Sequence, residues 1–96
     1  MHLNDKITIS SQVVARRVGS DTVILHLGSG TYFGLDPLGS RIWQLMGEGN
    51  TLAEICELML PEYDVTREVL QRDALSLAQN LVAENLINTA NSSLKP

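Results

Sequence analysis

The spacing of apolar residues changes once along this chain, close to residue 36. Before that point the apolar side chains alternate with polar or small ones, which is the two-residue period of β-strands. The alternation predicts strands over residues 13–18, 22–27 and 31–35, separated by glycine-containing turns. Because short links join neighbouring strands, we expect an antiparallel meander in which the third strand forms one edge.

After residue 36 the apolar residues follow the helical period. Asp36 and Pro37 are favourable as N-cap and first helical residue, and they predict a helix that ends at Gly47. Residues 51–54, Thr-Leu-Ala-Glu, form a capping box for a second helix that ends at Pro61.

A third helix is expected from Asp64 or Thr66 to about Asn85. Its inner stripe consists of Leu70, Ala74, Leu77 and Leu81. Further apolar residues widen this stripe beyond the ~100° that a packed helix needs, so the extra flank either covers the sheet or receives a partner. Strands followed by helices predict an α+β domain with the helices on one face of a small sheet.

The composition predicts one domain with an uneven charge. The chain has 96 residues, of which 44% are hydrophobic, and a formal net charge of −4. Residues 1–45 hold four basic and three acidic side chains, whereas residues 46–96 hold three basic and eight acidic ones. The acidic helical half favours a protein or peptide partner over a nucleic acid, which usually requires a basic stripe. The polar ends, residues 1–6 and 88–96, are expected to be loose.

The sequence also predicts where the protein resides. It contains no apolar run of ~18 residues, so we expect no membrane span. The N-terminus lacks a basic start and an apolar run, and Cys56 is the one cysteine. A reducing cytoplasm is therefore the expected location.

No pattern of residues predicts catalysis. Gly28 and Gly30 precede a strand, whereas a phosphate site needs a helix N-terminus, so they are interpreted as a hairpin turn. The histidines and Cys56 lack metal-ligand spacing, and Cys56 is expected to be a core residue. Trp43 is also expected in the core, and one of the two aromatic residues at 32 and 33 should join it.

Four stretches together resemble the PqqD-like family, the precursor-peptide recognition elements of ribosomally made, modified peptides. They read GTYFGL, DPLGSRIWQLM, TLAEICELMLPEY and VLQRDALSLAQNLVAENLI, within about residues 7–88. The shared marks are the aromatic third strand, the tryptophan of the first helix and Asp73. Asn85 replaces the glycine that is typical near the end of the third helix.

The resemblance implies a winged-helix-like fold and a non-catalytic function without cofactor or metal. The leader segment of a precursor peptide would add as a strand to the third strand, beside the third helix. The domain would then deliver the precursor to a leader peptidase or another modifying enzyme. A short chain of this kind resembles the lasso-peptide systems most, with a pyrroloquinoline-quinone-type peptide chaperone as the alternative.

Carried onto this sequence, the resemblance gives a set of expected peptide-binding residues on the third strand and the third helix. They are Thr31, Tyr32, Phe33, Gly34, Leu35, Arg72, Asp73, Leu75, Ser76, Gln79 and Asn80. The rotation of the third helix stays open, so the pairs Leu75/Gln79 and Asp73/Asn80 compete for the groove. A winged-helix nucleic-acid binder and a homodimer that pairs through the third strand remain as other hypotheses.

Overall fold

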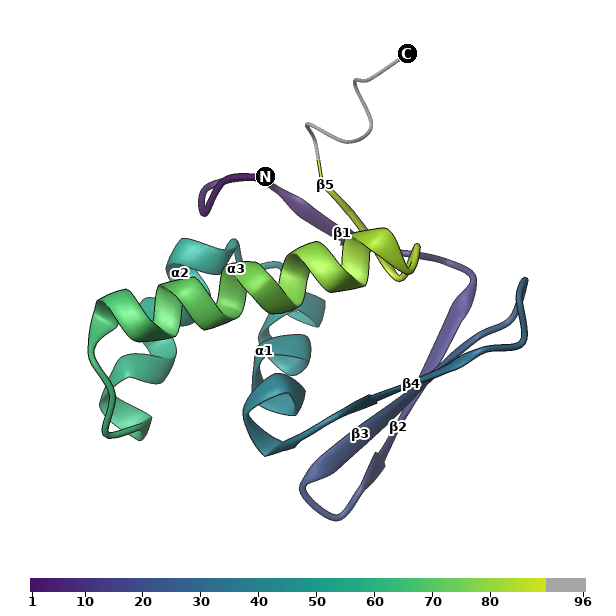
Figure 1. Cartoon of the computed structure of the whole chain (residues 1–96), viewed down its shortest axis with the longest axis horizontal. Helices are drawn as coiled ribbons and strands as arrows, with labels where there is room; N and C mark the ends of the chain where they lie inside the picture. Colours follow the sequence, from purple (N-terminus) through teal and green to yellow (C-terminus); the bar gives the residue numbers. More distant parts are fainter. Residues whose placement is uncertain (90–96) are drawn as a thin grey trace.

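The computed structural model describes residues 1–89, which form two small antiparallel sheets and three α-helices (Figure 1). The larger sheet has the order β2-β3-β4 and is the predicted meander; its strands are β2 (Val13–Val18), β3 (Asp21–His26) and β4 (Tyr32–Leu35). The helices follow as α1 (Pro37–Gly47), α2 (Leu52–Met59), a 3₁₀ turn η1 (Leu60–Glu62) and α3 (Arg67–Ala83). The predicted α+β class is confirmed.

The register of the sheet decides which side chains face the helices. Ile24 pairs with Phe33, and the fully buried Ile24 side chain identifies this as the helix-facing side. Tyr32 and Gly34 occupy the alternate positions of β4 and therefore face outward. Tyr32 is 72% exposed, so of the two aromatic residues it is Phe33 that packs against the core.

The helix starts follow from the capping residues that the sequence shows. The Asp36 carboxylate accepts a hydrogen bond from Gly39 N–H at 2.8 Å, and it thus caps α1. Thr51 and Glu54 form both bonds of the predicted capping box. Thr66 caps α3 by accepting from Val69 N–H, which decides between the two predicted starts.

Helix α3 ends at Ala83, two residues before the predicted end at Asn85, because Asn85 adopts a left-handed conformation with φ of 61°. Asn85 N–H donates to the Val82 carbonyl at 3.0 Å, and Leu86 N–H donates to the Leu81 carbonyl at 2.9 Å. This pair of bonds is a Schellman motif, and Asn is among the few non-glycine residues that adopt its left-handed position readily.

The prediction of loose ends is wrong for the described residues. A second sheet pairs β1 (Ile7–Ile9) with β5 (Ile87–Thr89), and the N-terminal segment is held where Ala53 N–H donates to the Leu3 carbonyl at 2.9 Å. Three-residue strands give almost no periodic signal, and their partners are ~80 residues apart in sequence, so local patterns do not predict this pairing. Residues 90–96, also expected to be loose, lie outside the described residues.

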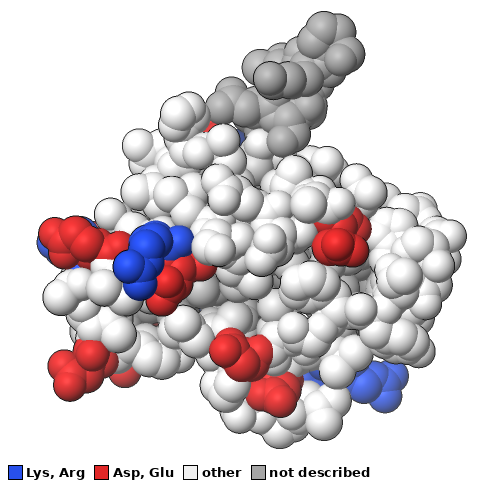
Figure 2. Space-filling model, viewed as in Figure 1, with Lys and Arg blue, Asp and Glu red and all other residues white. Residues whose placement is uncertain are grey.

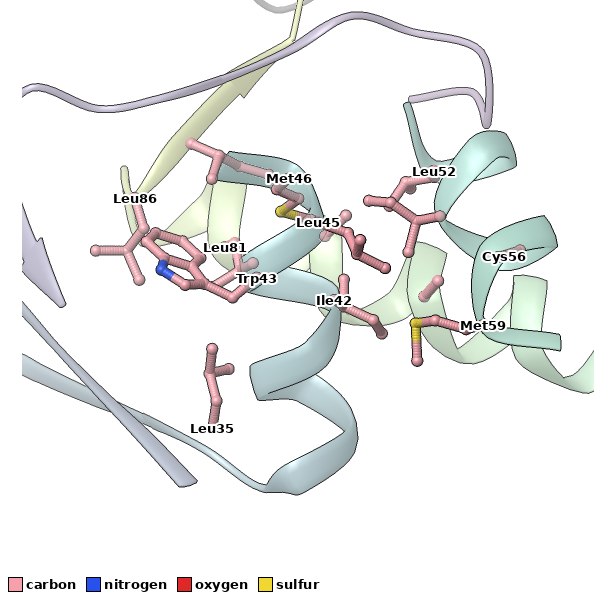
Figure 3. Close-up of a cluster of buried hydrophobic side chains, with 14 of the residues drawn as sticks. Leu35, Ile42, Trp43, Leu45, Met46, Leu52, Cys56, Met59, Leu81 and Leu86 are labelled. Carbon is pink, nitrogen blue, oxygen red and sulfur yellow. The ribbon is translucent and has the colours of Figure 1, made fainter. Parts of the chain in front are cut away.

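The core lies mainly among the three helices (Figure 3), and the larger sheet contributes Ile24 and Leu35 to it. Trp43 on α1 is buried, as predicted, and it lies toward Leu86, on the opposite side of α1 from α2 (Figure 3). Cys56 on α2 is buried as well, which confirms its expected place in the core. Within the described part of the chain, no helix combines the length and apolar character that crossing a membrane requires.

Candidate functional site

A groove of about 520 Å³ lies between the free edge of β4, the first turns of α1 and one side of α3. Strand β4 and helix α1 meet at the Asp36–Pro37 step, and α3 crosses α1 (Figure 1). The groove is lined by Phe33, Gly34, Leu35, Asp36, Leu38, Gly39, Ile42, Asp73, Ser76, Leu77 and Asn80.

Strand β4 offers unpaired backbone groups along this groove. Within the described residues its one strand neighbour is β3, and His26 N–H donates to the Thr31 carbonyl at 2.9 Å. Antiparallel pairing alternates between bonded and non-bonded residue pairs, so the next bonded pair is Ile24 with Phe33. The N–H and C=O groups of Tyr32 and Gly34 are consequently directed away from β3, toward the free edge.

The structure brings six of the eleven predicted site residues to the groove lining. These are Phe33, Gly34, Leu35, Asp73, Ser76 and Asn80. The rotation of α3 that the sequence left open is therefore the one that turns Asp73 and Asn80 toward the groove, and not Leu75 and Gln79. The remaining predicted residues lie outside the lining; they are Thr31, Tyr32, Arg72, Leu75 and Gln79.

Five lining residues were missing from the sequence prediction: Asp36, Leu38, Gly39, Ile42 and Leu77. Four of them belong to the start of α1, which follows β4 without a loop. The adjacent Asp36–Pro37 cap was a usable signal, because a helix that begins where an edge strand ends must lie beside that edge. Leu77 was expected in the inner stripe of α3, but it is half-buried, and Ala78 takes the buried position instead.

The groove combines apolar walls with two carboxylates. Phe33, Leu38 and Leu77 are partly buried and contact the core. Asp36 is engaged by Gly39 N–H, and Asp73 accepts from Arg72 Nε across a long, exposed contact of 3.4 Å. No lysine or arginine is part of the lining, so the groove complements a segment with apolar and basic side chains.

The site offers contacts for binding, and the cysteine of the chain is not among its lining residues. Cys56 is buried in the core, and burial raises the pKa of its thiol, which keeps the thiol protonated. Among residues 1–89, no cluster of three or more His, Cys, Asp or Glu side chains could hold a metal ion. The groove thus offers backbone hydrogen bonding at β4, apolar contact, and the carboxylates of Asp36 and Asp73.

Comparison with protein families places these features in a known group. The family described as coenzyme PQQ synthesis protein D (PqqD) matches residues 21–87, which is most of the chain and includes β4, α1 and α3. The chain belongs to the PqqD family. The predicted family resemblance is therefore confirmed.

This PqqD-family chain also resembles two solved structures. The first is TbiB1 in complex with the TbiA(beta) leader peptide, which is 41% identical with a TM-score of 0.81 over 84% of this chain and 94% of that chain. The second is lasso peptide synthetase B1 complexed with the leader peptide, with 22% identity and a TM-score of 0.79 over 85% and 96% of the two chains. At that identity the second structure shows the shared fold alone. Comparison with curated protein sequences gives no match.

Proposed function

We propose that this PqqD-family chain binds the leader segment of a ribosomally made precursor peptide and performs no catalysis itself. The leader adds as a strand to β4 and lies in the groove beside α3, and the chain delivers the precursor to a leader peptidase or another modifying enzyme of lasso-peptide biosynthesis. The observation that supports this proposal most directly is the groove at the free edge of β4. The chain that has this groove is 41% identical to TbiB1, whose solved structure holds a leader peptide.

Strand addition explains how one small groove supplies both affinity and selectivity. The outward N–H and C=O groups of Tyr32 and Gly34 pair with any extended backbone, and so supply affinity without regard to sequence. Alternate side chains of the added strand then face the groove, where Phe33, Leu38 and Leu77 supply apolar contacts. A basic leader side chain would find Asp36 and Asp73 at the same groove.

The charges on the helices support a nucleic-acid partner less well than a leader peptide. The basic residues between Gly47 and Ile87 are Arg67 and Arg72, and both form ion pairs, with Glu57 and Asp73 respectively. Helix α3 therefore presents no unpaired cation to a phosphate backbone. A pyrroloquinoline-quinone-type chaperone would use the same groove and would differ in the precursor that it binds.

Fluorescence polarisation with a labelled leader peptide tests the proposal. The probe is the leader of the precursor encoded beside the gene, with a scrambled leader and a DNA duplex as controls. We expect saturable binding of the leader alone. Absence of binding by every leader encoded nearby would contradict the function, and duplex binding with a steep salt dependence would favour the nucleic-acid hypothesis instead.

Light scattering of the free protein tests the homodimer hypothesis, because a stable dimer without leader affinity would favour homodimerisation.

A further inference from the structure

The opposite edge of the same sheet, strand β2, is also free within the described residues, since the sheet order is β2-β3-β4. Leu27 N–H donates to the Gln12 carbonyl at 2.7 Å, next to the start of β2. Bonded and non-bonded residue pairs alternate along an antiparallel ladder. Counted from this bond, the backbone groups of every second β2 residue point away from β3. These outward-directed residues are Val13, Ala15 and Arg17.

A cavity of about 290 Å³ lies behind this edge, between β2 and α1. Its lining includes Ala15 and Arg17 from β2, Thr22 from β3, and Trp43 and Gln44 from α1. None of these residues lines the groove beside β4, so the two hollows are separate. Helix α1 covers the middle of the sheet and leaves the inner side of β2 exposed, which is why the cavity opens at the edge.

The cavity contains a buried polar group without a partner. Thr22 is 2% exposed, and its Oγ1 is the buried side-chain oxygen or nitrogen for which the described structure shows no hydrogen bond. Burying a hydroxyl without a hydrogen bond is unfavourable, and most buried polar groups in proteins are paired. The hydroxyl has almost no accessible surface, so it belongs to the closed wall behind the cavity and is not available to a ligand.

The β2 edge is also basic in an otherwise acidic molecule. Arg16 and Arg17 alternate along the strand, so Arg16 faces the outer side of the sheet and Arg17 faces the cavity side. Neither forms an ion pair with any described residue, in contrast to the arginines of α1 and α3. Acidic side chains gather instead at the end of the molecule formed by α2, η1 and the start of α3 (Figure 2).

We propose that β2 is a second strand-addition site, and that its occupant is an extended acidic segment of another protein. The backbone of that segment pairs with Val13, Ala15 and Arg17, and its carboxylates pair with Arg16 and Arg17. This site lies beyond the proposed leader function and does not depend on it. Because β2 and β4 are opposite edges of one sheet, both sites are available at the same time.

A second copy of this chain is a poorer occupant than an acidic segment. Antiparallel pairing of two β2 strands would place the Arg16–Arg17 pairs of both copies near one another across the new ladder. Like charges that lie opposite each other destabilise strand pairing. An acidic strand replaces that repulsion with ion pairs at the same positions.

NMR titration of the ¹⁵N-labelled full chain tests this proposal with two designed peptides. The probe is acetyl-Thr-Val-Glu-Glu-Val-Thr-amide, whose adjacent glutamates face opposite sides of an added strand as Arg16 and Arg17 do, and its counterpart carries lysine in place of glutamate. We expect the glutamate peptide to shift amides of β2 and not those of β4, and to bind about tenfold or more tightly than the lysine peptide. The double variant Arg16→Glu/Arg17→Glu should reverse that preference.

Two further variants examine the backbone and the cavity separately. Ala15→Pro removes an outward-directed N–H and leaves the β2–β3 ladder intact, so it should abolish the shifts. Thr22→Val removes the unpartnered hydroxyl without touching the edge, so it should keep or raise the melting temperature and leave the affinity for the glutamate peptide unchanged.

Three results would overturn the second site: no β2 shifts at millimolar glutamate peptide, equal binding of both peptides, or an unchanged preference in the charge-reversed variant. The last two would mean that the arginines only protect the edge from aggregation. A leader titration on the same sample separates this proposal from the proposed function, since leader binding by β4 would persist if the β2 site alone were wrong.

Discussion

At the scale of single residues, the two adjacent aromatic side chains of β4 have opposite surroundings. Phe33 lies across from Ile24, packs against the core and lines the groove, whereas Tyr32 lies 72% exposed on the outer face of the sheet. The two-residue period of a strand predicts opposite faces for them. It does not predict which ring faces inward, because both are large and apolar and the register with β3 decides.

This difference gives the first mutational prediction. Phe33→Ala should weaken leader binding about tenfold or more, since buried aromatic residues dominate the energetics of interfaces. Tyr32→Ala is the matched control and should change the affinity by no more than about threefold, because solvent-exposed contacts contribute little. Fluorescence polarisation gives both affinities, and thermal melting shows whether each variant is folded. A larger loss for Tyr32→Ala would contradict the described groove.

A second prediction at this scale concerns the end of α3. Asn85 has φ of 61°, a conformation that costs most side chains ~1 kcal/mol or more and costs glycine almost nothing. Asn85→Ala should therefore lower the free energy of unfolding by about 1 kcal/mol, while Asn85→Gly should cause no loss. Urea denaturation measures both. Equal stability of the two variants would show that the fold does not require a left-handed backbone conformation at residue 85.

At the scale of elements, two ion pairs join α1 and α3, which line the groove, to η1 and α2, which do not. Arg41 on α1 contacts Glu62 in η1 at 2.7 Å, and Arg67 at the start of α3 contacts Glu57 on α2 at 2.7 Å. The arginine hydrogen bonds lower the pKa of both glutamates below their ordinary value of 4.5. The four side chains are 30% to 55% exposed, so solvent screens these pairs and they contribute little to the stability of the fold.

The lowered pKa values of Glu57 and Glu62 predict a pH dependence of stability with a definite sign. The folded state binds protons less readily than the unfolded state, so the contribution is present above pH 4.5 and is lost as the pH falls below it. The double variant Glu57→Gln/Glu62→Gln should melt slightly below the wild-type chain at pH 7, and the difference should vanish in acid. A gap that widens toward low pH would contradict this sign.

At the same scale, sequence patterns predict some elements of the fold and not others. Strands β2 to β4 and all three helices follow from local signals, because alternation, capping residues and glycine stops act within a few neighbours. The pairing of β1 with β5 joins short segments from both ends of the described chain and has no local signature. The rotation of α3 was also undetermined between Leu75/Gln79 and Asp73/Asn80 at the groove, since the apolar arc of α3 is wide and the packing of the whole domain decides which part of it is buried.

At the scale of the whole molecule, both proposals depend on the two free strand edges of the larger sheet. The helices cover the inner face of β3 and β4, but both outer strands keep a free edge within the described residues. The β4 edge adjoins a groove with apolar walls and two carboxylates, and the β2 edge carries two unpaired arginines. The two proposals together predict that the chain holds two extended segments of different charge at the same time.

The most direct test of strand addition at β4 compares two substitutions at Gly34. Gly34→Pro removes the outward-directed N–H while the β3 ladder bonds at Phe33 remain. Gly34→Ala keeps that N–H, and a methyl group there would meet no atom within 4 Å. Leader affinity, measured by fluorescence polarisation with folded variants, should fall about tenfold or more in Gly34→Pro and stay close to wild type in Gly34→Ala. Unchanged affinity in the proline variant would contradict leader binding by strand addition to β4.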